Sequence, residues 1–148
     1  MPGPSLPDCD SAGSGLNGTK SNALRRTPNS ILFPFASAEV TPEGKEALAI
    51  IIEDIISRPY EKVWVRGHTD DVPVKRPETL KKFPHGNMHL SVERAVEVAA
   101  LLVGQDKVEE AKLVVMGFGP NEPLVENSSP ENRQKNRRVE ILVTEPGH

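Results

Sequence analysis

Four short apolar segments are spaced along the chain, and they predict four β-strands. They lie at residues 31–35, 63–67, 113–116 and 139–143. In the second and fourth segments apolar residues alternate with larger or charged ones, which is the period of a strand. Pro34 cannot donate a hydrogen bond to a neighbouring strand, so the first segment predicts an edge strand. The segment 63–67 predicts a central strand that is buried on both faces.

Three helices are predicted in the gaps between these strands. Each gap contains a hydroxyl residue that can cap the start of a helix, and two of the three caps precede a proline. Pro59 and Gly104 supply the stop signals of the first two helices. The predicted N-caps are Thr41, Ser91 and Ser129. The apolar faces of the first two helices are Leu48, Ile51, Ile52 and Ile55, and Ala95, Val98, Ala99 and Leu102.

The predicted order of elements is strand-helix-strand-helix-strand-helix-strand, which indicates an α/β fold. Such an alternation packs helices against a sheet. The chain is therefore expected to form a βαβαβαβ sandwich, in which helices cover one or both faces of a four-stranded sheet. Residues 74–86 contain two prolines and several basic residues, and they predict a long loop before the second helix.

The N-terminal segment differs from the rest of the chain. Residues 1–28 are rich in Pro, Gly, Ser and Asn and have no hydrophobic period, so they predict a disordered tail or linker. The folded domain is expected to cover residues 29–145. Residues 21–23, Ser-Asn-Ala, are typical of the scar left when an expression tag is cleaved, so we expect the native sequence to begin near Leu24.

Composition narrows the class of function. A chain of 148 residues fits one domain with a core of its own. Its net charge of −3 gives no overall positive field, so we expect no nucleic-acid partner. The single cysteine, Cys9, excludes an internal disulfide framework and a cysteine-based zinc cluster. No segment approaches the roughly 20 apolar residues that a membrane helix needs.

An acid and a base occupy positions that can face one pocket. Asp70 follows the predicted central strand, and Arg94 lies in the first turn of the predicted second helix. If this strand and helix pack together, the carboxylate and the guanidinium can grip a ligand that carries both an ammonium and a carboxylate. Free backbone N–H groups at the start of a helix would also favour an anion near Arg94.

Three other classes of function compete with simple ligand binding. A metal enzyme could use the spacings His68-x-Asp70 and His85-x-x-x-His89, although the second suits zinc only on a helix, and Gly86 argues against one there. A hydrolase of the glycosidase type needs two carboxylates that face each other across the scissile bond, whereas the adjacent Asp70 and Asp71 would point to opposite sides of an extended chain. A domain that binds protein alone is the third class.

Four motifs occur in order along the chain. They are Gly67-His68-Thr69-Asp70-Asp71-Val72-Pro73, Asn87-x-x-Leu90-Ser91-x-x-Arg94-Ala95, Gly117-Phe118-Gly119 and Asn136-Arg137-Arg138-Val139-Glu140-Ile141. Together they resemble the OmpA-like peptidoglycan-binding domain, and the resemblance covers residues 31–143. Within that family the doublet Asp70-Asp71 and the long loop before Asn87 are most similar to the C-terminal domain of flagellar stator anchors of the MotB type. One departure precedes the second helix, where MotB-type members carry Ser-Asn-Trp and this chain has Gly-Asn-Met.

The resemblance implies a mixed sheet and a ligand. The ligand would be the stem peptide of peptidoglycan, recognised at diaminopimelate, with Asp70 accepting from the ammonium and Arg94 bound to the carboxylate. Asn87 and Thr69 would add contacts from the rim. The residues expected to support this site are His68, Asp71, Leu90 and Arg137. Arg137 could instead have a purely structural role, and the choice between the two stays open.

The resemblance also implies an anchoring role without catalysis or a cofactor. The domain would be periplasmic and homodimeric, and it would hold an envelope complex to the cell wall. For a MotB-type protein, an upstream membrane segment absent from this sequence would anchor the chain in the inner membrane and join it to a stator partner of the MotA type. The alternative is a tether of the outer membrane to peptidoglycan, of the Pal or OmpA type.

Overall fold

The computed structural model describes residues 23–104 and 107–147. Residues 1–22 of the predicted tail, which was expected to cover residues 1–28, lie outside the described residues. In this range the chain forms one sheet, four α-helices and a short 3-10 helix, Glu110–Lys112. The strands are β1 (Leu24–Arg26), β2 (Ile31–Leu32), β3 (Lys62–Gly67), β4 (Leu113–Gly117) and β5 (Arg138–Thr144). The α-helices are α1 (Pro42–Ile56), α2 (Pro77–Lys82), α3 (Gly86–Val103) and α4 (Pro130–Asn136).

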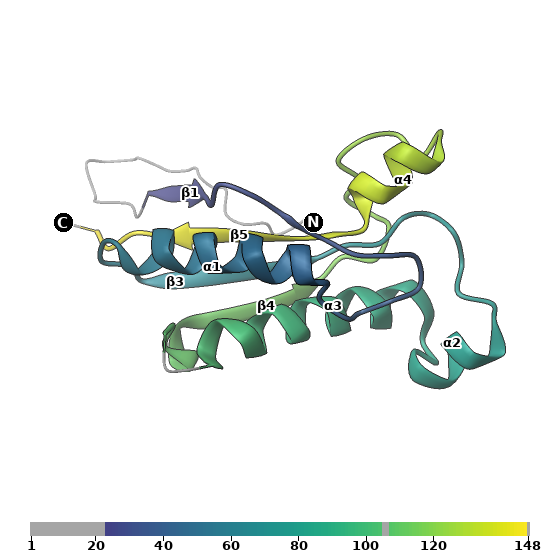
Figure 1. The fold of residues 1–148 in the computed structure, drawn as a ribbon, viewed down its shortest axis with the longest axis horizontal. Coiled ribbons are helices and arrows are strands. Elements are labelled where there is room, and N and C mark those ends of the chain that lie inside the picture. The colour runs from purple at the N-terminus through teal and green to yellow at the C-terminus, as the bar shows by residue number, and fades with distance from the viewer. Residues whose placement is uncertain (1–22, 105–106, 148) are drawn as a thin grey trace.

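The sheet is mixed, and β3 is one of its central strands (Figure 1). The strand order is β1-β5-β3-β4, and β2 pairs with the start of β5. The strands β3 and β4 are parallel, because α3 carries the chain back across the sheet between them. The strand β5 is antiparallel to all its neighbours. The predicted fold class, an α/β sandwich with a mixed sheet, is confirmed, but the sheet of the described residues has five strands rather than the four predicted.

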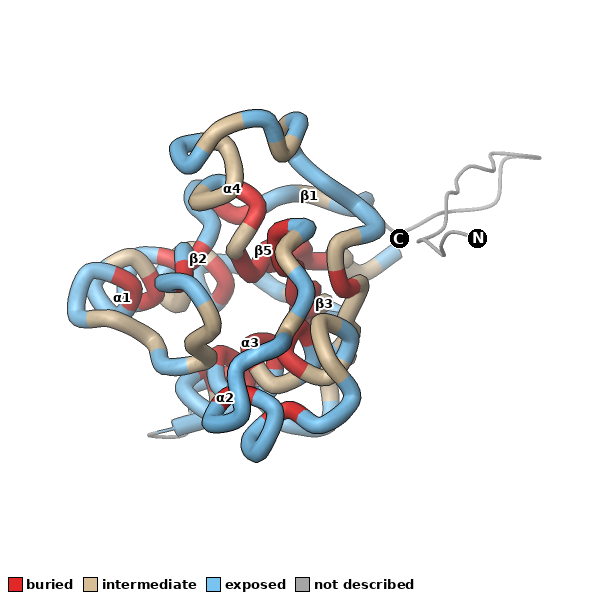
Figure 2. The backbone as a smooth tube through the Cα atoms, turned by 90° about the vertical axis from the view of Figure 1, so that its right-hand side faces the viewer, coloured by how far each residue is buried: buried red, intermediate tan, exposed pale blue. Residues whose placement is uncertain are grey.

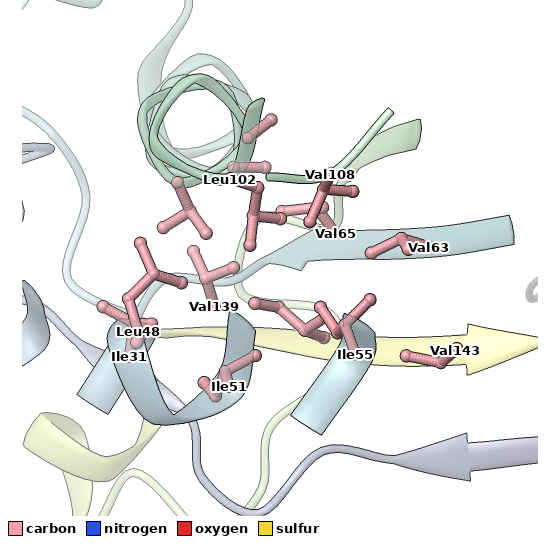
Figure 3. Close-up of a cluster of buried hydrophobic side chains, with 14 of the residues drawn as sticks. Ile31, Leu48, Ile51, Ile55, Val63, Val65, Leu102, Val108, Val139 and Val143 are labelled. Carbon is pink, nitrogen blue, oxygen red and sulfur yellow. The ribbon is translucent and has the colours of Figure 1, made fainter. Parts of the chain in front are cut away.

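The helices α1 and α3 pack on one face of the sheet and form the hydrophobic core there. Figure 3 shows their apolar side chains against the alternate residues of β3 and β5 that point to that face. The core residues of the helices include Leu48, Ile51, Ile55, Val98 and Leu102, and those of the strands include Ile31, Val63, Val65, Val139, Ile141 and Val143. The end-on view in Figure 2 shows the buried residues concentrated where these elements meet.

Local sequence signals placed two helix starts correctly. The hydroxyl of Thr41 accepts a hydrogen bond from the Gly44 N–H at 3.0 Å. The hydroxyl of Ser129 accepts one from the Asn132 N–H at 3.1 Å. In both cases a proline occupies the first turn, where its missing N–H costs nothing.

The predicted start of the second long helix was wrong. Helix α3 begins at Gly86, and Ser91 lies inside it and is fully buried. The Ser91 hydroxyl donates to the Met88 carbonyl at 2.8 Å and accepts from the Gly119 N–H at 2.9 Å. It therefore joins the helix to the turn after β4, which is a tertiary role that a local capping signal does not reveal.

Two further predictions need correction. Residues 24–26 were assigned to the tail, but they form β1, which pairs with the end of β5. Residues 74–86 were predicted as a loop, but Pro77–Lys82 forms the short helix α2 within it. Its proline lies in the first turn, where proline favours a helix start rather than preventing one. Figure 1 shows α2 beyond the end of the sheet, at the same end of the molecule as α4.

Candidate functional site

A cavity of about 170 Å³ opens at the carboxyl end of β3. The carboxyl ends of parallel strands are the usual position of ligand sites in α/β sheets. Six of the predicted site residues line this cavity: Thr69, Asp70, Asn87, Leu90, Arg94 and Arg137. They come from the end of β3, from α3 and from the residue that follows α4. The fold thus brings together residues that are up to 68 positions apart in the sequence.

Asp70 is buried and already has two partners. Only 3% of the residue is exposed. Its Oδ1 accepts a hydrogen bond from the Val72 N–H at 3.0 Å, and its Oδ2 lies 2.9 Å from Arg137 Nη1. A carboxylate has about four acceptor positions, so about two remain for a ligand. The ion pair compensates the charge of Asp70, which would be costly to bury alone.

Arg137 is held in place by more than this ion pair. Its Nε donates to the Phe33 carbonyl at 3.0 Å, and its Nη2 donates to Gln134 Oε1 at 2.8 Å. Gln134 in turn donates to the same Phe33 carbonyl at 3.1 Å. Arg137 therefore orients Asp70 from a fixed position in the wall of the cavity.

Arg94 is fully buried and bound to backbone carbonyl groups. Its Nε donates to Ser37 at 2.8 Å, its Nη1 to His68 at 3.0 Å and its Nη2 to Pro34 at 3.1 Å. Burial lowers the pKa of Arg94 to about 9, against the opposing effect of the Asp70 charge. The group remains cationic at neutral pH. Three of the five N–H groups are used, so two remain for a ligand.

The position of Arg94 in its helix differs from the prediction. Because α3 begins at Gly86, Arg94 lies in its third turn rather than its first. The N–H groups around it are bonded within the helix, so the expected contribution of free backbone N–H groups to anion binding was wrong. Asn87, Leu90 and Arg94 follow the helical spacing i, i+3, i+7, and all three side chains reach the cavity.

Asn87 and Thr69 fix the chain that surrounds the cavity. The Asn87 side-chain amide donates to the Val72 carbonyl at 3.0 Å, so the N–H and the carbonyl of Val72 are both held by site residues. The Thr69 hydroxyl donates to the Asp70 carbonyl at 2.8 Å. The Asn87 amide oxygen remains available for a ligand donor.

Two of the predicted supporting residues do not line the cavity. Asp71 Oδ1 accepts from Arg133 Nε at 3.0 Å at the surface. The His68 ring is buried and stacks on Phe118, with 5.2 Å between ring centroids. His68 reaches the site only through its backbone carbonyl, which accepts from Arg94.

The His68 side chain belongs to a buried charged cluster, which we define as Arg66, His68, Arg138 and Glu140. Glu140 lies 3.4 Å from Arg66, 2.6 Å from Arg138 and 3.6 Å from His68 Nε2. Burial alone would raise the pKa of Glu140, but His68 and Arg138 together lower it to about 2. Burial lowers the pKa of His68. Arg138 therefore has a structural role, distinct from that of the neighbouring Arg137.

Part of the cavity wall was missed by the sequence reasoning. The exposed aromatic ring of Phe35 and the basic residues Lys75 and Arg76 form its rim. The Arg76 guanidinium lies 5.8 Å from the centroid of the Phe35 ring. Charge was visible in residues 75–76, but nothing local indicated that this segment turns towards residues 33–37.

The candidate metal ligands do not converge. His85 occupies the N-cap position of α3 and His89 lies within the helix, so the sequence argument against a helix at this pair was wrong. Their ring centroids are 5.8 Å apart. Within residues 23–104 and 107–147, no group of three or more His, Cys, Asp or Glu residues is arranged to hold a metal ion. In the same residues, no helix combines the length and the apolar character that crossing a bilayer requires.

Residues 32–137 match the OmpA family. Motility protein B of Bacillus subtilis is 32% identical over 129 residues, which cover 87% of this chain and 48% of that protein. The chain thus spans about half the length of the curated relatives it matches.

Solved structures of similar proteins also match this chain. The cell wall anchor of the type VI secretion system (T6SS) of Pseudomonas aeruginosa aligns with a TM-score of 0.65 and 35% identity, over 78% of this chain and 76% of that one. The periplasmic domain of Helicobacter pylori MotB aligns with a TM-score of 0.67 and 30% identity, over 84% and 75% of the two chains.

Proposed function

The chain belongs to the OmpA family, and from this we propose that its cavity binds the stem peptide of peptidoglycan at diaminopimelate, without catalysing a reaction. The observation that carries the proposal is the pairing, in one small cavity, of a buried carboxylate and a buried guanidinium that both keep free bonding positions. A diaminopimelate end carries an ammonium and a carboxylate, and these match Asp70 and Arg94.

The chemistry of Arg94 gives the site a means of selecting its ligand. The carboxylate of diaminopimelate would receive the two unused N–H groups of Arg94. A lysine-type stem peptide lacks this carboxylate, so the buried guanidinium would lose that interaction, at a cost of about 1–3 kcal/mol. Asn87 and Thr69 would contact the ligand from the wall, and Arg137 would keep Asp70 oriented.

We also propose the setting in which this binding acts. The domain would lie in the periplasm as part of a homodimer and would anchor an envelope complex to the cell wall. The 32% identity to Motility protein B favours a flagellar stator complex with a MotA-type partner. The likeness to the cell wall anchor of the T6SS of Pseudomonas aeruginosa supports a role in wall anchoring.

Co-sedimentation with purified sacculi tests the proposed function. Asp70→Asn keeps the size of the side chain and its acceptor for the Val72 N–H but removes the charge, so we expect this variant to lose at least tenfold in affinity for sacculi. Asp71→Asn is the matched control, because Asp71 lies outside the cavity and pairs with Arg133 at the surface. Sacculi with diaminopimelate should retain more protein than sacculi with lysine. Equal retention of Asp70→Asn and the unmodified protein would show that the cavity is not the wall site.

A further inference from the structure

The candidate cavity is lined by more positive than negative side chains. Its wall contains Lys75, Arg76, Arg94 and Arg137, and a single acid, Asp70. Arg137 pairs with Asp70. No carboxylate in the described part of the chain forms an ion pair with Lys75 or Arg76. The rim thus offers two cations that are not neutralised by the protein.

These two cations stand beside an exposed aromatic ring. Lys75 and Arg76 are solvent-exposed and lie between the end of β3 and the start of α2. Phe35 is 45% exposed, and the Arg76 guanidinium lies over its ring at 5.8 Å from the centroid. Cation–π attraction restricts Arg76 to the rim of the cavity without using its hydrogen-bond donors. The N–H donors of Arg76 therefore remain available to the part of a bound ligand that extends out of the cavity on this side.

The size of the cavity requires most of the ligand to lie outside it. A volume of about 170 Å³ is smaller than the roughly 300–1,000 Å³ of sites that enclose a whole small molecule. It accommodates the end group of a diamino acid, and the rest of the peptide must cross the rim. In a stem peptide the preceding residue is a glutamate joined through its side-chain carboxyl, so its main-chain carboxylate is free unless it is amidated.

We propose that Lys75 and Arg76 bind this second carboxylate. They would make the domain select stem peptides whose glutamate carboxylate is free over those in which it is a carboxamide. The proposal rests on the proposed function, because it places the diaminopimelate end between Asp70 and Arg94. It adds a specificity-determining contact on a segment that is separate from the elements that carry Asp70 and Arg94.

Calorimetric titration with two synthetic peptides tests this contact. The first is L-alanyl-γ-D-glutamyl-meso-diaminopimelate, and the second is the same peptide with its glutamate carboxylate amidated. The unmodified protein should bind the free acid about tenfold more tightly, because two exposed charge contacts are lost in the amide. Lys75→Gln/Arg76→Gln should abolish this preference by weakening only the binding of the free acid.

The matched control is Lys81→Gln/Lys82→Gln, which makes the same change in net charge. Lys81 and Lys82 are exposed residues of α2 that do not line the cavity, so this variant should keep the preference. Equal binding of the two peptides by the unmodified protein would overturn the inference, as would a preference that survives in Lys75→Gln/Arg76→Gln or disappears in the control. If neither peptide binds, or if Asp70→Asn binds both peptides normally, the proposed function itself fails and this inference fails with it.

Discussion

Arg94 has two functions that a single substitution cannot easily separate. Its guanidinium faces the cavity, but it also donates to the carbonyls of Pro34 and Ser37, at the two sides of a tight turn. Within that turn Ala36 has a φ of 60°, in the left-handed region that disfavours a side chain. The hydrogen bonds of Arg94 hold this turn, and with it Phe35, at the rim. Arg94 thus shapes the cavity as well as supplying its positive charge.

Arg94→Lys should therefore weaken the fold together with ligand binding. A lysine ammonium cannot reach three carbonyl groups in the geometry of a guanidinium, so at least one buried carbonyl loses its partner. We expect the free energy of unfolding to fall by about 2–4 kcal/mol, measured by urea denaturation. Arg133→Lys is the control, since Arg133 forms only a partly exposed ion pair with Asp71 and should cost less than about 1 kcal/mol. Equal unfolding midpoints in the two variants would contradict the structural role of Arg94.

The buried charged cluster should make the fold sensitive to acid. The pKa of Glu140 is about 2 in the folded protein and 4.5 as the ordinary value, so its stabilisation is complete above about pH 4.5 and is lost as the pH falls towards 2. The pKa of His68 is lowered from 6.5 by burial, so the unfolded chain takes up a proton below about pH 6.5 before the folded protein does. Both effects have the same sign: the free energy of unfolding decreases as the pH falls.

Glu140→Gln tests the larger of these effects. This substitution leaves Arg66 and Arg138 without their shared carboxylate, so we expect a loss of about 3–5 kcal/mol at pH 7. The variant should also lose the part of the pH dependence that lies between pH 4.5 and 2, when urea denaturation is followed across that range. Glu97→Gln, at an exposed position of α3, should leave both quantities unchanged. A full acid response in Glu140→Gln would assign the transition to other carboxylates.

At the scale of elements, the site depends on how closely α3 approaches two strands. Gly67 of β3 and Gly117 of β4 are paired in register beneath this helix. A Cβ on Gly67 would lie 1.9 Å from the backbone oxygen of Ser91, and one on Gly117 would lie 2.4 Å from a Val92 methyl carbon. The two glycines thus set the depth of α3, and with it the position of Asn87 and Arg94 over the cavity.

Gly67→Ala should consequently lower stability and ligand binding together. The new methyl group can be accommodated only if α3 moves away from the sheet, so we expect the free energy of unfolding to fall by about 3 kcal/mol or more. The control is Gly104→Ala, where an added Cβ meets nothing within 4 Å and the backbone has a negative φ of −59°. That variant should melt within a few degrees of the unmodified protein. Similar melting temperatures for both variants would refute the close packing of α3.

The same elements show which features the sequence could predict. Thr41 and Ser129 were correctly predicted as N-caps because a cap acts within one turn of its own helix. Ser91 is also a hydroxyl residue near a helix start, but its position in α3, packed against two strands, depends on contacts with Gly67 and the turn at Gly119. Pairing partners are equally non-local, so the sequence did not decide between a structural and a binding role for Arg137. The cavity residues Asp70, Asn87 and Arg94 were predictable from motifs, whereas Phe35, Lys75 and Arg76 were not.

At the scale of the whole molecule, the first strand of the described chain begins far from the cavity. Leu24 pairs with Thr144 at one end of the sheet, where β3 also begins at Lys62. The cavity lies at the opposite end, near Asp70 and Arg137. The length of β5, Arg138–Thr144, separates these ends by about 20 Å. A tether joined before Leu24 would therefore present the cavity away from its attachment point.

This geometry leads to a prediction about valency. A cavity that holds one end group should bind weakly, but a wall repeats the same peptide many times, so two cavities on one tether can bind at once. We expect the chain, joined before Leu24 to a dimeric coiled coil, to reach half-saturation of sacculi at about a hundredfold lower concentration than the same fusion with a monomeric helix. Sedimentation equilibrium would verify the two oligomeric states. Asp70→Asn in the dimeric fusion should remove this gain in affinity. Two linked cavities bind more tightly than one only if each cavity binds the peptide by itself. Identical saturation curves for the two fusions would mean that the paired cavities cannot reach neighbouring peptides, and wall anchoring would then need a different arrangement of the two domains.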